Sequence, residues 1–388
     1  MIKYASQNID KEDIKIVSKV LRGNFLTQGP EVKKFEKRLI LKTNAKYAIS
    51  VSSGTAALKI ALRSLNLKSN EGVVVPAITF VATINATKDI TKNIFISDID
   101  KDTGCMSFEK FLQAVNHAKK KNIKIKTLIN VHYAGQGQDV LEIFNFCKKN
   151  RIKIIEDACH SLGSKYKIGS KIYSVGSCSH SDITTFSFHS IKNITTGEGG
   201  CILTNNKKIY QKSLLYRSHG IVKKNFWIYN ASVFSENYRL TDFQCALGTS
   251  QLRKLENYKK KKDKVYKYYK KKLEHYKIFM STINKNSGWN VHWHLFPILL
   301  NKKFIKLKKK LFIFFKENNI QTQVHYIPIY KHSIYKNKFI QGFFNGSEEF
   351  YKRELSLPFH TKLTKLDIDY IFNILDKFLS KNKIKRNK

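Results

Sequence analysis

The residues with the clearest chemical potential lie in one polar stretch, which reads SFHSIKNITTGEGG from Ser187 to Gly200. Apolar, β-rich runs flank it at residues 183–186 and 201–204, so Lys192 is expected in a glycine-bearing turn between two strands. Connecting segments of this kind carry binding and catalytic residues more often than the elements they join. The amine of Lys192 is therefore a candidate for covalent catalysis.

Lysine is so frequent in this chain that Lys192 alone would be interpreted as a solvated surface charge. Three features favour chemistry instead: the Ser187 hydroxyl, the Thr-Thr-Gly-Glu-Gly-Gly run after the lysine, and an acidic strand end at Asp157. A hydroxyl and a glycine-rich turn suit a phosphate, and a carboxylate suits a protonated ring nitrogen. Together these features predict a lysine that forms a Schiff base with a phosphate-bearing cofactor.

A second candidate phosphate site lies at residues 52–55, where Ser-Ser-Gly-Thr ends a predicted strand and begins a helix. Backbone amides at a helix N-terminus form a ready anion site. The amides of Thr55 and Ala56, together with the Thr55 hydroxyl, are therefore candidate phosphate ligands. Ordinary helix capping would explain the same residues equally well.

An acidic strand end followed by a histidine forms the third candidate feature. Asp157 closes the apolar run Ile-Ile-Glu-Asp, and His160 follows in the motif EDACH. Asp157 is placed to pair with a protonated pyridine nitrogen, and His160 to lie flat against the ring. Taken separately, a helix cap and a packed histidine are the simpler interpretations. In combination with Lys192, Ser187 and Thr55, a cofactor site is favoured.

The composition indicates a globular protein of two domains. With 388 residues, 42% of them hydrophobic, the chain can bury a sizeable core. No apolar run approaches the roughly 20 residues that a membrane helix needs, and the N-terminal segment shows no secretory signal. The six cysteines include no CxxC pair, which is typical of reduced thiols in a cytoplasmic enzyme. We expect a cytoplasmic protein with no membrane association and no metal.

The charge balance is strongly basic, with a net charge of +42 from 71 basic and 29 acidic residues. Such a balance is compatible with binding to nucleic acid or to an anionic surface. Only nine of the basic residues are Arg, however, and the densest lysine runs, at 259–264 and 306–310, lie in apparently amphipathic helices. Compositional bias on solvated faces is therefore favoured over a nucleic-acid site. A positive field would still attract an anionic substrate such as a sugar nucleotide.

Strands and helices alternate before residue 250. A helix is predicted at 10–22 with Asp10 as its cap, and a second helix begins near Pro30. Strands are predicted at 48–51, 72–76, 94–100, 127–133 and 153–155, with helices between them. Continuously apolar strands that alternate with helices indicate a mainly parallel α/β sheet. Ligands of such sheets gather at the carboxyl ends of the strands.

The pattern changes near residue 250. A long Lys- and Tyr-rich helix is predicted over 251–276, then a strand at 293–299, a helix at 305–318 and a last helix at 365–379. We predict a large domain at 1–250, which includes an N-terminal arm at 1–12, and a smaller domain at 251–388.

Several longer motifs resemble those of the DegT-type sugar aminotransferases, which are fold-type I enzymes that use pyridoxal phosphate. They extend from the N-terminal arm to Pro358 and read LTQGPEVKKFE, SSGTAAL, AITFVATINA, HYAGQ, IIEDACHSLGS, SFHSIKNITTGEGG, YRSHGI and NYRLTDFQCALGTSQL. On these motifs the chain is identified as a member of the family. The resemblance implies a large α/β domain with a mainly parallel central sheet and a smaller C-terminal α+β domain.

The resemblance also implies roles for residues around the cofactor. Lys192 would form the Schiff base and Asp157 would pair with the pyridine nitrogen, so these two residues would be catalytic. His160 would stack on one face of the ring and Phe80 on the other. The phosphate would be bound by Gly54, Thr55, Ala56 and Ser187. Many relatives have proline where this chain has Ser190, a position that only shapes the loop before the lysine.

Further roles implied by the resemblance concern a partner subunit and the substrate. Asn237, in the motif NYRL, would reach the phosphate of the neighbouring subunit's cofactor, which implies a homodimer with shared active sites. The positions that would contact a sugar nucleotide are Tyr4, Asn24, Phe25, Leu26, Thr27, His325 and Tyr326.

The motifs FLTQGP, EDACHSLGS, YRSHGI and VHYIPIY resemble members that act in pseudaminic acid biosynthesis. This resemblance implies transfer of an amino group from L-glutamate to C4 of a UDP-linked 4-keto-6-deoxy amino sugar. Another keto sugar nucleotide, linked to dTDP, GDP or UDP, is the alternative substrate. Sugar 3-dehydratases of the same fold carry His at the lysine position, so the intact Lys192 counts against that activity. A nucleic-acid-binding protein would need a basic motif interleaved with aromatic residues, and none is visible.

Overall fold

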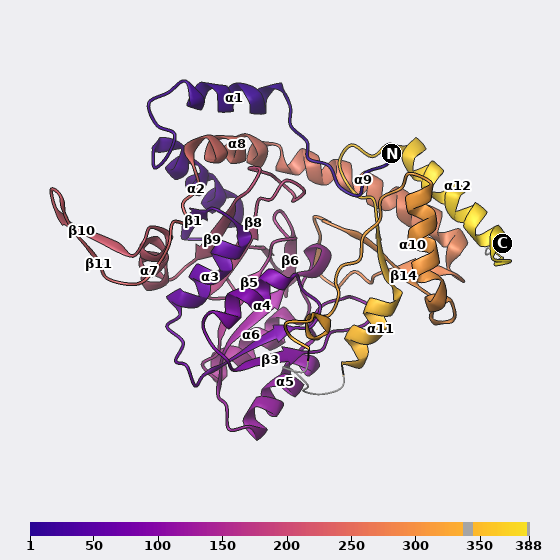
Figure 1. The fold of residues 1–388 in the computed structure, drawn as a ribbon, viewed down its shortest axis with the longest axis horizontal. Coiled ribbons are helices and arrows are strands. Elements are labelled where there is room, and N and C mark those ends of the chain that lie inside the picture. Colours follow the sequence, from indigo (N-terminus) through magenta and orange to yellow (C-terminus); the bar gives the residue numbers. More distant parts are fainter. Residues whose placement is uncertain (337–343, 386–388) are drawn as a thin grey trace.

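The computed structural model describes residues 1–336 and 344–385, and Figure 1 shows the fold. Seven strands form the central sheet in the order β1-β9-β8-β5-β4-β2-β3. These strands are β1 (Tyr47–Val51), β2 (Gly72–Pro76), β3 (Ile94–Ser97), β4 (Ile125–Val131), β5 (Lys153–Asp157), β8 (Ile183–Ser187) and β9 (Gly200–Thr204). Only β9 runs against its neighbours, β8 and β1, and the other pairs are parallel. The predicted mainly parallel sheet is confirmed.

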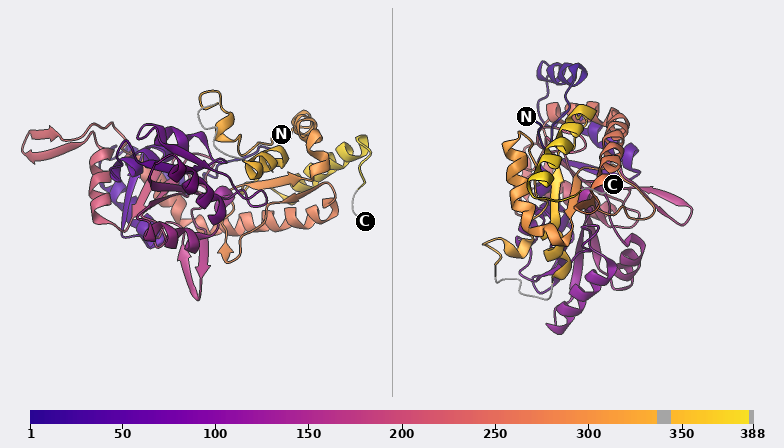
Figure 2. Two further views of the ribbon diagram at one scale, coloured as in Figure 1. Left: turned by 90° about the horizontal axis from the view of Figure 1, so that it is seen from below. Right: turned by 90° about the vertical axis from the view of Figure 1, so that its right-hand side faces the viewer.

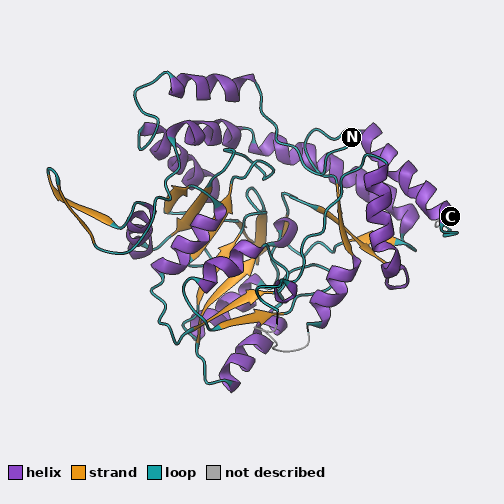
Figure 3. Ribbon diagram, viewed as in Figure 1, coloured by secondary structure: helices purple, strands orange, loops and turns teal. Residues whose placement is uncertain are grey.

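Helices cover both faces of this sheet, as Figures 2 and 3 show. Successive residues of a strand point to opposite faces, so Val74 of β2 lies in one apolar core and Val73 in the other. Burial on both faces explains why runs such as Val73–Val75 are continuously apolar. The helices of this part are α1 (Lys11–Leu21), α2 (Pro30–Thr43), α3 (Gly54–Ser64), α4 (Val81–Lys88), α5 (Phe108–Lys120), α6 (Val140–Lys149), α7 (Lys207–Arg217) and α8 (Asp242–Arg253).

The predicted starts of the first two helices are confirmed. Asp10 caps α1 by accepting a hydrogen bond from the Asp13 amide, and the Asp13 carboxylate accepts one from the Asp10 amide. Pro30 is the first residue of α2, where its missing amide proton costs nothing. The strand predicted at 94–100 ends earlier, at Ser97, because the Asp98 carboxylate turns away to accept hydrogen bonds from two amides near residue 346.

The C-terminal part contains a three-stranded antiparallel sheet in the order β12-β14-β15. Its strands are β12 (Met280–Thr282), β14 (Phe296–Leu300) and β15 (Glu354–Leu357), and its helices are α9 (Leu255–Leu273), α10 (Lys308–Glu317), α11 (Asn345–Arg353) and α12 (Lys365–Lys381). This sheet lies wholly after residue 250 and the central sheet wholly before it. The proposed division into two domains at that residue stays a prediction.

The single long helix predicted over 251–276 is wrong, because two helices meet at Lys254. The Lys254 amide donates to the carbonyls of Gln251 and Leu252, so the hydrogen-bonding pattern of α8 tightens and ends there. The Lys254 amine lies 2.8 Å from Asp10 Oδ2 and 2.7 Å from Asp13 Oδ1. These ion pairs hold the junction against the start of α1.

Two smaller sheets connect or extend the two parts. The strand β13 (Trp289–Asn290) pairs with β6 (Lys165–Ile168), which pairs with β7 (Lys171–Ser174). The hairpin of β10 (Ile221–Asn225) and β11 (Ile228–Ala231) projects from the body beside α7 (Figure 1). Among the described helices, none is long and apolar enough to cross a membrane.

Candidate active site

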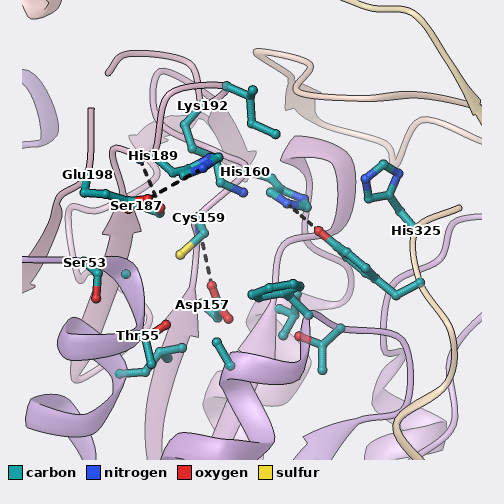
Figure 4. Close-up of a pocket in the computed structure, with 18 residues that line it drawn as sticks. Ser53, Thr55, Asp157, Cys159, His160, Ser187, His189, Lys192, Glu198 and His325 are labelled. Carbon is teal, nitrogen blue, oxygen red and sulfur yellow. Dashed lines mark hydrogen bonds and ion pairs between the residues drawn. The ribbon is translucent and has the colours of Figure 1, made fainter. Parts of the chain in front are cut away.

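A cavity of about 470 Å³ lies where the carboxyl ends of β5 and β8 meet the start of α3. In the parallel sheet Asp157, at the end of β5, pairs with Val131 of β4 and Thr185 of β8, so residues that end these strands share one edge. Nine residues that the sequence analysis singled out line the cavity: Gly54, Thr55, Phe80, Asp157, His160, Ser187, Lys192, His325 and Tyr326. Figure 4 shows Ser53, Thr55 and Ser187 on one side of it and His160 and His325 on the other.

Lys192 lies on the loop between β8 and β9, as predicted, and contributes to the cavity wall. Burial lowers the pKa of its amine from the ordinary value of 10.5, although Cys159 and Asp157 partly oppose this shift. A lowered pKa increases the fraction of neutral amine near pH 7. Only the neutral amine can attack a carbonyl carbon, so the environment of Lys192 suits a nucleophile.

Asn193 anchors the loop that carries Lys192. Its Nδ2 donates to the carbonyl oxygens of Leu162, at 3.0 Å, and His292, at 3.3 Å. Its Oδ1 accepts a 2.9 Å hydrogen bond from Nζ of Lys262, a lysine of α9 that is only 5% exposed. The side chain of Asn193 therefore fixes the loop between the two parts of the chain.

Asp157 is buried at the floor of the cavity. Its Oδ2 accepts a hydrogen bond from Thr83 Oγ1 at 2.9 Å, and its Oδ1 accepts one from the Cys159 amide at 3.3 Å (Figure 4). Thr83 in turn lies 2.8 Å from the hydroxyl of Thr79, one helical turn earlier. Two neutral donors thus orient the carboxylate without neutralising its charge. Thr83 was not predicted from the sequence, where its only signal is two threonines four residues apart after a strand end.

The start of α3 and the Ser187 hydroxyl form a small cup that suits a phosphate. A Cβ atom at Gly54 would lie 2.8 Å from Ser187 Cβ, so the two segments touch with no room for a side chain. The Ala56 amide, one of the predicted phosphate ligands, donates instead to Ser53 Oγ at 3.0 Å. The proposed phosphate ligands therefore narrow to the amides of Gly54 and Thr55 and the hydroxyls of Thr55 and Ser187.

The two residues predicted to contact the faces of the cofactor ring, His160 and Phe80, reach the cavity from different elements. The Nε2 atom of His160 lies 3.1 Å from the Tyr326 hydroxyl, and burial lowers the pKa of His160 well below its usual value. A neutral imidazole held in this way can pack against an aromatic ring. Phe80 is 57% exposed at the start of α4, with its ring centroid 6.0 Å from that of Tyr326. An exposed phenyl group at a cavity mouth is available to cover a ligand.

Not all of the predicted ligand residues meet at this cavity. Tyr4 contacts it indirectly, through a 3.1 Å hydrogen bond between its hydroxyl and His325 Nε2. The loop 24–27 is held elsewhere, by a bridge between Thr27 and Thr241, and Asn237 is an exposed residue that pairs with Ser218. Within this chain, loop 24–27 and Asn237 are not among the described residues that line the cavity. Their roles toward substrate and cofactor stay predictions.

Nine further residues line the cavity, and five of them carry polar or ionisable side chains that were assigned no role from the sequence: Ser53, Thr79, Cys159, His189 and Glu198. His189 and Glu198 belong to the lysine motif itself and lie 3.7 Å apart across the loop. The antiparallel pairing of β8 with β9 brings the two ends of that motif together. Both residues lie inside the stretch from Ser187 to Gly200 that was singled out from the sequence, but neither was assigned a role there.

The bond between Asn193 and Lys262 can be tested by a double-mutant cycle. Asn193→Leu should lower the free energy of unfolding by about 1–3 kcal/mol, because the buried amine loses its partner. Lys262→Met should also destabilise the chain, by orphaning Asn193 Oδ1. The double variant should be more stable than the sum of the two losses predicts. Urea denaturation measures all four stabilities, and strictly additive losses would show that the two residues act independently.

The pH dependence of the same variants adds a second check. Burial lowers the pKa of Lys262 from 10.5 to about 7. The unfolded chain therefore binds a proton that the folded chain does not, and folding becomes less favourable as the pH falls between these values. Wild type should lose stability relative to Lys262→Met as the pH falls from about 10 to about 7. If the difference in stability between wild type and Lys262→Met stayed constant over this pH range, Lys262 would keep its proton in the folded chain.

Comparison with known proteins places this site in a family. Over residues 7–376 the sequence matches the DegT/DnrJ/EryC1/StrS aminotransferase family. A relative from Campylobacter jejuni subsp. jejuni serotype O:23/36 (strain 81-176) is named UDP-4-amino-4,6-dideoxy-N-acetyl-beta-L-altrosamine transaminase. It is 38% identical over 381 residues, which cover 97% of this chain and 98% of that protein.

Solved structures agree with this result. Helicobacter pylori PseC, an aminotransferase involved in the biosynthesis of pseudoaminic acid, is 30% identical and superposes with a TM-score of 0.90, covering 98% of this chain and 99% of its own. The PLP form of the putative sugar aminotransferase Spr1654 from Streptococcus pneumoniae is 27% identical, with a TM-score of 0.87 and coverage of 98% and 99%. The fold is that of fold-type I enzymes, as the motifs predicted. The chain belongs to the DegT/DnrJ/EryC1/StrS family and is a pyridoxal-phosphate-dependent sugar aminotransferase.

Proposed function

We propose that this enzyme transfers the amino group of L-glutamate to C4 of a UDP-linked 4-keto-6-deoxy amino sugar. The product would be UDP-4-amino-4,6-dideoxy-N-acetyl-β-L-altrosamine, used for pseudaminic acid. The observation that carries the chemistry is the convergence of Lys192, Asp157 and the cup formed by Gly54 and Ser187 on one cavity. The choice of sugar is supported by similarity, over nearly the whole chain, to a transaminase named for that product.

The residues around the cavity fit pyridoxal phosphate at each of its ends. Asp157 would pair with the ring nitrogen, His160 and Phe80 would cover the two ring faces, and Ser187 and the start of α3 would hold the phosphate. When bound, pyridoxal phosphate supplies an electron sink for the substrate carbon that loses its proton. The ionised Asp157 carboxylate would keep the ring nitrogen protonated.

Lys192 would have two tasks in the same position. Its neutral amine, favoured by burial, would hold the cofactor covalently before substrate arrives. Once displaced by the substrate amine, Nζ of Lys192 would accept the proton that leaves the α-carbon of glutamate and would donate it to the cofactor carbon that retains the amino group. In the second half of the reaction, the same atom would move a proton in the opposite direction and donate it to C4 of the sugar.

A homodimer with shared sites is the assembly that we propose. The β10–β11 hairpin exposes aromatic side chains, among them Phe226 at 92% and Trp227 at 82% exposure, and Phe234 after it is 84% exposed. Aromatic side chains gathered on a projecting hairpin mark an interaction surface. Asn237 follows directly on this segment, which supports its reaching a partner's phosphate. The six cysteines are all free, which supports a cytoplasmic location.

The substrate proposal is tested by product analysis. Purified enzyme, given L-glutamate and a panel of UDP-, dTDP- and GDP-linked 4-keto sugars, should form a 4-amino sugar most efficiently from the UDP-linked amino sugar. NMR of the product identifies the aminated carbon. A preference for a dTDP- or GDP-sugar would replace the proposed substrate. Lys192→Ala should reduce turnover to below about a thousandth, whereas the matched variant Lys171→Ala, at an exposed lysine, should be unaffected.

The charge of Asp157 should matter more than its shape. Asp157→Asn should retain the cofactor but lose turnover by roughly 10²-fold, because an opposite charge nearby shifts a pKa by about 1–3 units. Thr83→Val removes only one hydrogen bond to the carboxylate and should have a smaller effect. Steady-state kinetics measure turnover, and the visible absorbance of the bound cofactor measures whether the cofactor is retained. Near-normal turnover of Asp157→Asn would reduce Asp157 to a structural residue.

Sharing of sites between subunits is tested by mixing two inactive variants. Lys192→Ala and Asn237→Asp chains that exchange subunits would form heterodimers with both defects in one site and an intact second site. Statistical exchange should then restore about a quarter of wild-type activity, since half of the dimers carry one working site in two. Activity that stays at the level of the parent variants after verified exchange would show that Asn237 serves its own chain.

A further inference from the structure

A chain of side-chain hydrogen bonds leads from the N-terminal arm through the cavity wall to a buried carboxylate. The Tyr4 hydroxyl lies 3.1 Å from His325 Nε2, and His325 Nδ1 lies 2.9 Å from Ser356 Oγ. Ser356 Oγ lies 2.6 Å from Oε1 of Glu354, at the start of β15. Glu354 and Ser356 have no exposed surface, and His325 is 8% exposed.

Hydrogen bonds from backbone amides fix three of these residues, His325, Glu354 and Ser356. Gln323 and Ser356 exchange two backbone hydrogen bonds, of 3.1 and 2.7 Å, which align the segment before His325 with β15. The His325 amide donates to the second carboxylate oxygen, Glu354 Oε2, at 2.9 Å. Both oxygens of Glu354 are therefore engaged, one by a backbone amide and one by a hydroxyl.

The donor in each bond follows from the number of protons that each group carries. An ionised carboxylate can only accept, so the single hydroxyl proton of Ser356 is directed at Glu354. Ser356 Oγ can then only accept from His325, which places the ring proton on Nδ1. A neutral imidazole carries one ring proton, so Nε2 of His325 accepts and Tyr4 donates.

The surroundings keep His325 and Glu354 in the protonation states that these hydrogen-bond directions require. Burial lowers the pKa of His325 to about 3, so its ring is neutral at any physiological pH. Burial raises the pKa of Glu354 to about 7, while the Ser356 hydroxyl, the half-buried ammonium of Lys308 and the His325 amide oppose the rise. Above pH 8 the carboxylate is ionised.

We propose that Glu354 and Ser356 are positioning residues that hold His325 as its Nδ1–H tautomer and thereby direct the Tyr4 hydroxyl proton at His325. The Tyr4 oxygen then has only lone pairs to offer. A substrate group that meets it must bring an N–H or O–H, such as a sugar hydroxyl or an acetamido N–H, and not a carboxylate or phosphate oxygen. This last step rests on the proposed role of Tyr4 in binding the sugar nucleotide.

Glu354→Gln is the sharpest test because it should reverse the whole chain without changing its shape. The His325 amide needs an acceptor, so the glutamine oxygen must face it and the glutamine NH₂ must face Ser356. Ser356 would then donate to His325 Nδ1, the ring proton would move to Nε2, and Nε2 would donate to Tyr4. Glu317→Gln, the same change at an exposed glutamate of α10, is the matched control.

The tautomer is read by ¹⁵N NMR of histidine-labelled holoenzyme at pH 8.5, with the His325 signals assigned by their absence in His325→Gln. Wild type and Glu317→Gln should show Nδ1 protonated and Nε2 bare, and Glu354→Gln should show the reverse. Ser356→Ala, which breaks the chain, should show a mixture. A protonated Nε2 in wild type overturns the proposal even if Glu354→Gln does not fold, and an unchanged tautomer in folded Glu354→Gln also overturns it.

Kinetics test whether the His325 tautomer affects binding of the sugar nucleotide. In Glu354→Gln the KM for the sugar nucleotide should rise roughly tenfold, equivalent to about 1.4 kcal/mol, while the half-reaction with glutamate keeps its rate. A reversed tautomer with an unchanged KM would overturn the substrate preference assigned to Tyr4 and leave the hydrogen-bond direction standing. Loss of both half-reactions together, with the tautomer unchanged, would point to a structural role and overturn the proposal.

Discussion

The active site depends on one backbone contact, where the start of α3 packs directly on β8 and β9. A Cβ atom at Gly200 would lie 2.3 Å from the Ser53 carbonyl oxygen, and one at Gly54 would lie 2.8 Å from Ser187 Cβ. Only glycine permits two segments to approach so closely. Because of this approach, the amides of a helix N-terminus lie beside the Ser187 hydroxyl, at the end of the strand from which the loop of Lys192 departs.

Charges around the cavity are held by neutral partners. Asp157 accepts hydrogen bonds from Thr83 and the Cys159 amide, and Glu354 accepts them from a serine and an amide. A buried charge needs hydrogen bonds to offset its desolvation, yet an ion pair would cancel its field. Neutral partners meet the first requirement and leave the charge of Asp157 available to a ligand. Burial lowers the pKa of Lys192 even though the nearby charge of Asp157 opposes that shift.

The sequence predicted those features that depend on local pattern. The turn around Lys192 and the strand end at Asp157 were predicted from apolar runs that end at polar residues or glycines. Both are found as expected. Thr83 and Ser356 could not be found in this way, because their partners Asp157 and His325 lie 74 and 31 residues away along the chain. The helix break at Lys254 was missed for a similar reason, since it is stabilised by acids near residue 10. The division into domains and the residues expected from a partner subunit remain predictions.

The N-terminal arm has no helix or long strand before residue 11, but it is held at both ends. Its first residues bond to the C-terminal part, through Ile2 with Gln321, at 3.0 Å, and Tyr4 with Phe359, also at 3.0 Å. Further along, the Asn8 carbonyl accepts a 2.9 Å hydrogen bond from Gln251 of α8. An arm fixed in this way behaves as part of the cavity wall, because moving it would withdraw the Tyr4 hydroxyl from His325. The cavity wall is thus assembled from two segments more than 300 residues apart in the chain. The hydrogen bond between Tyr4 and His325 makes the geometry of the wall depend on both segments.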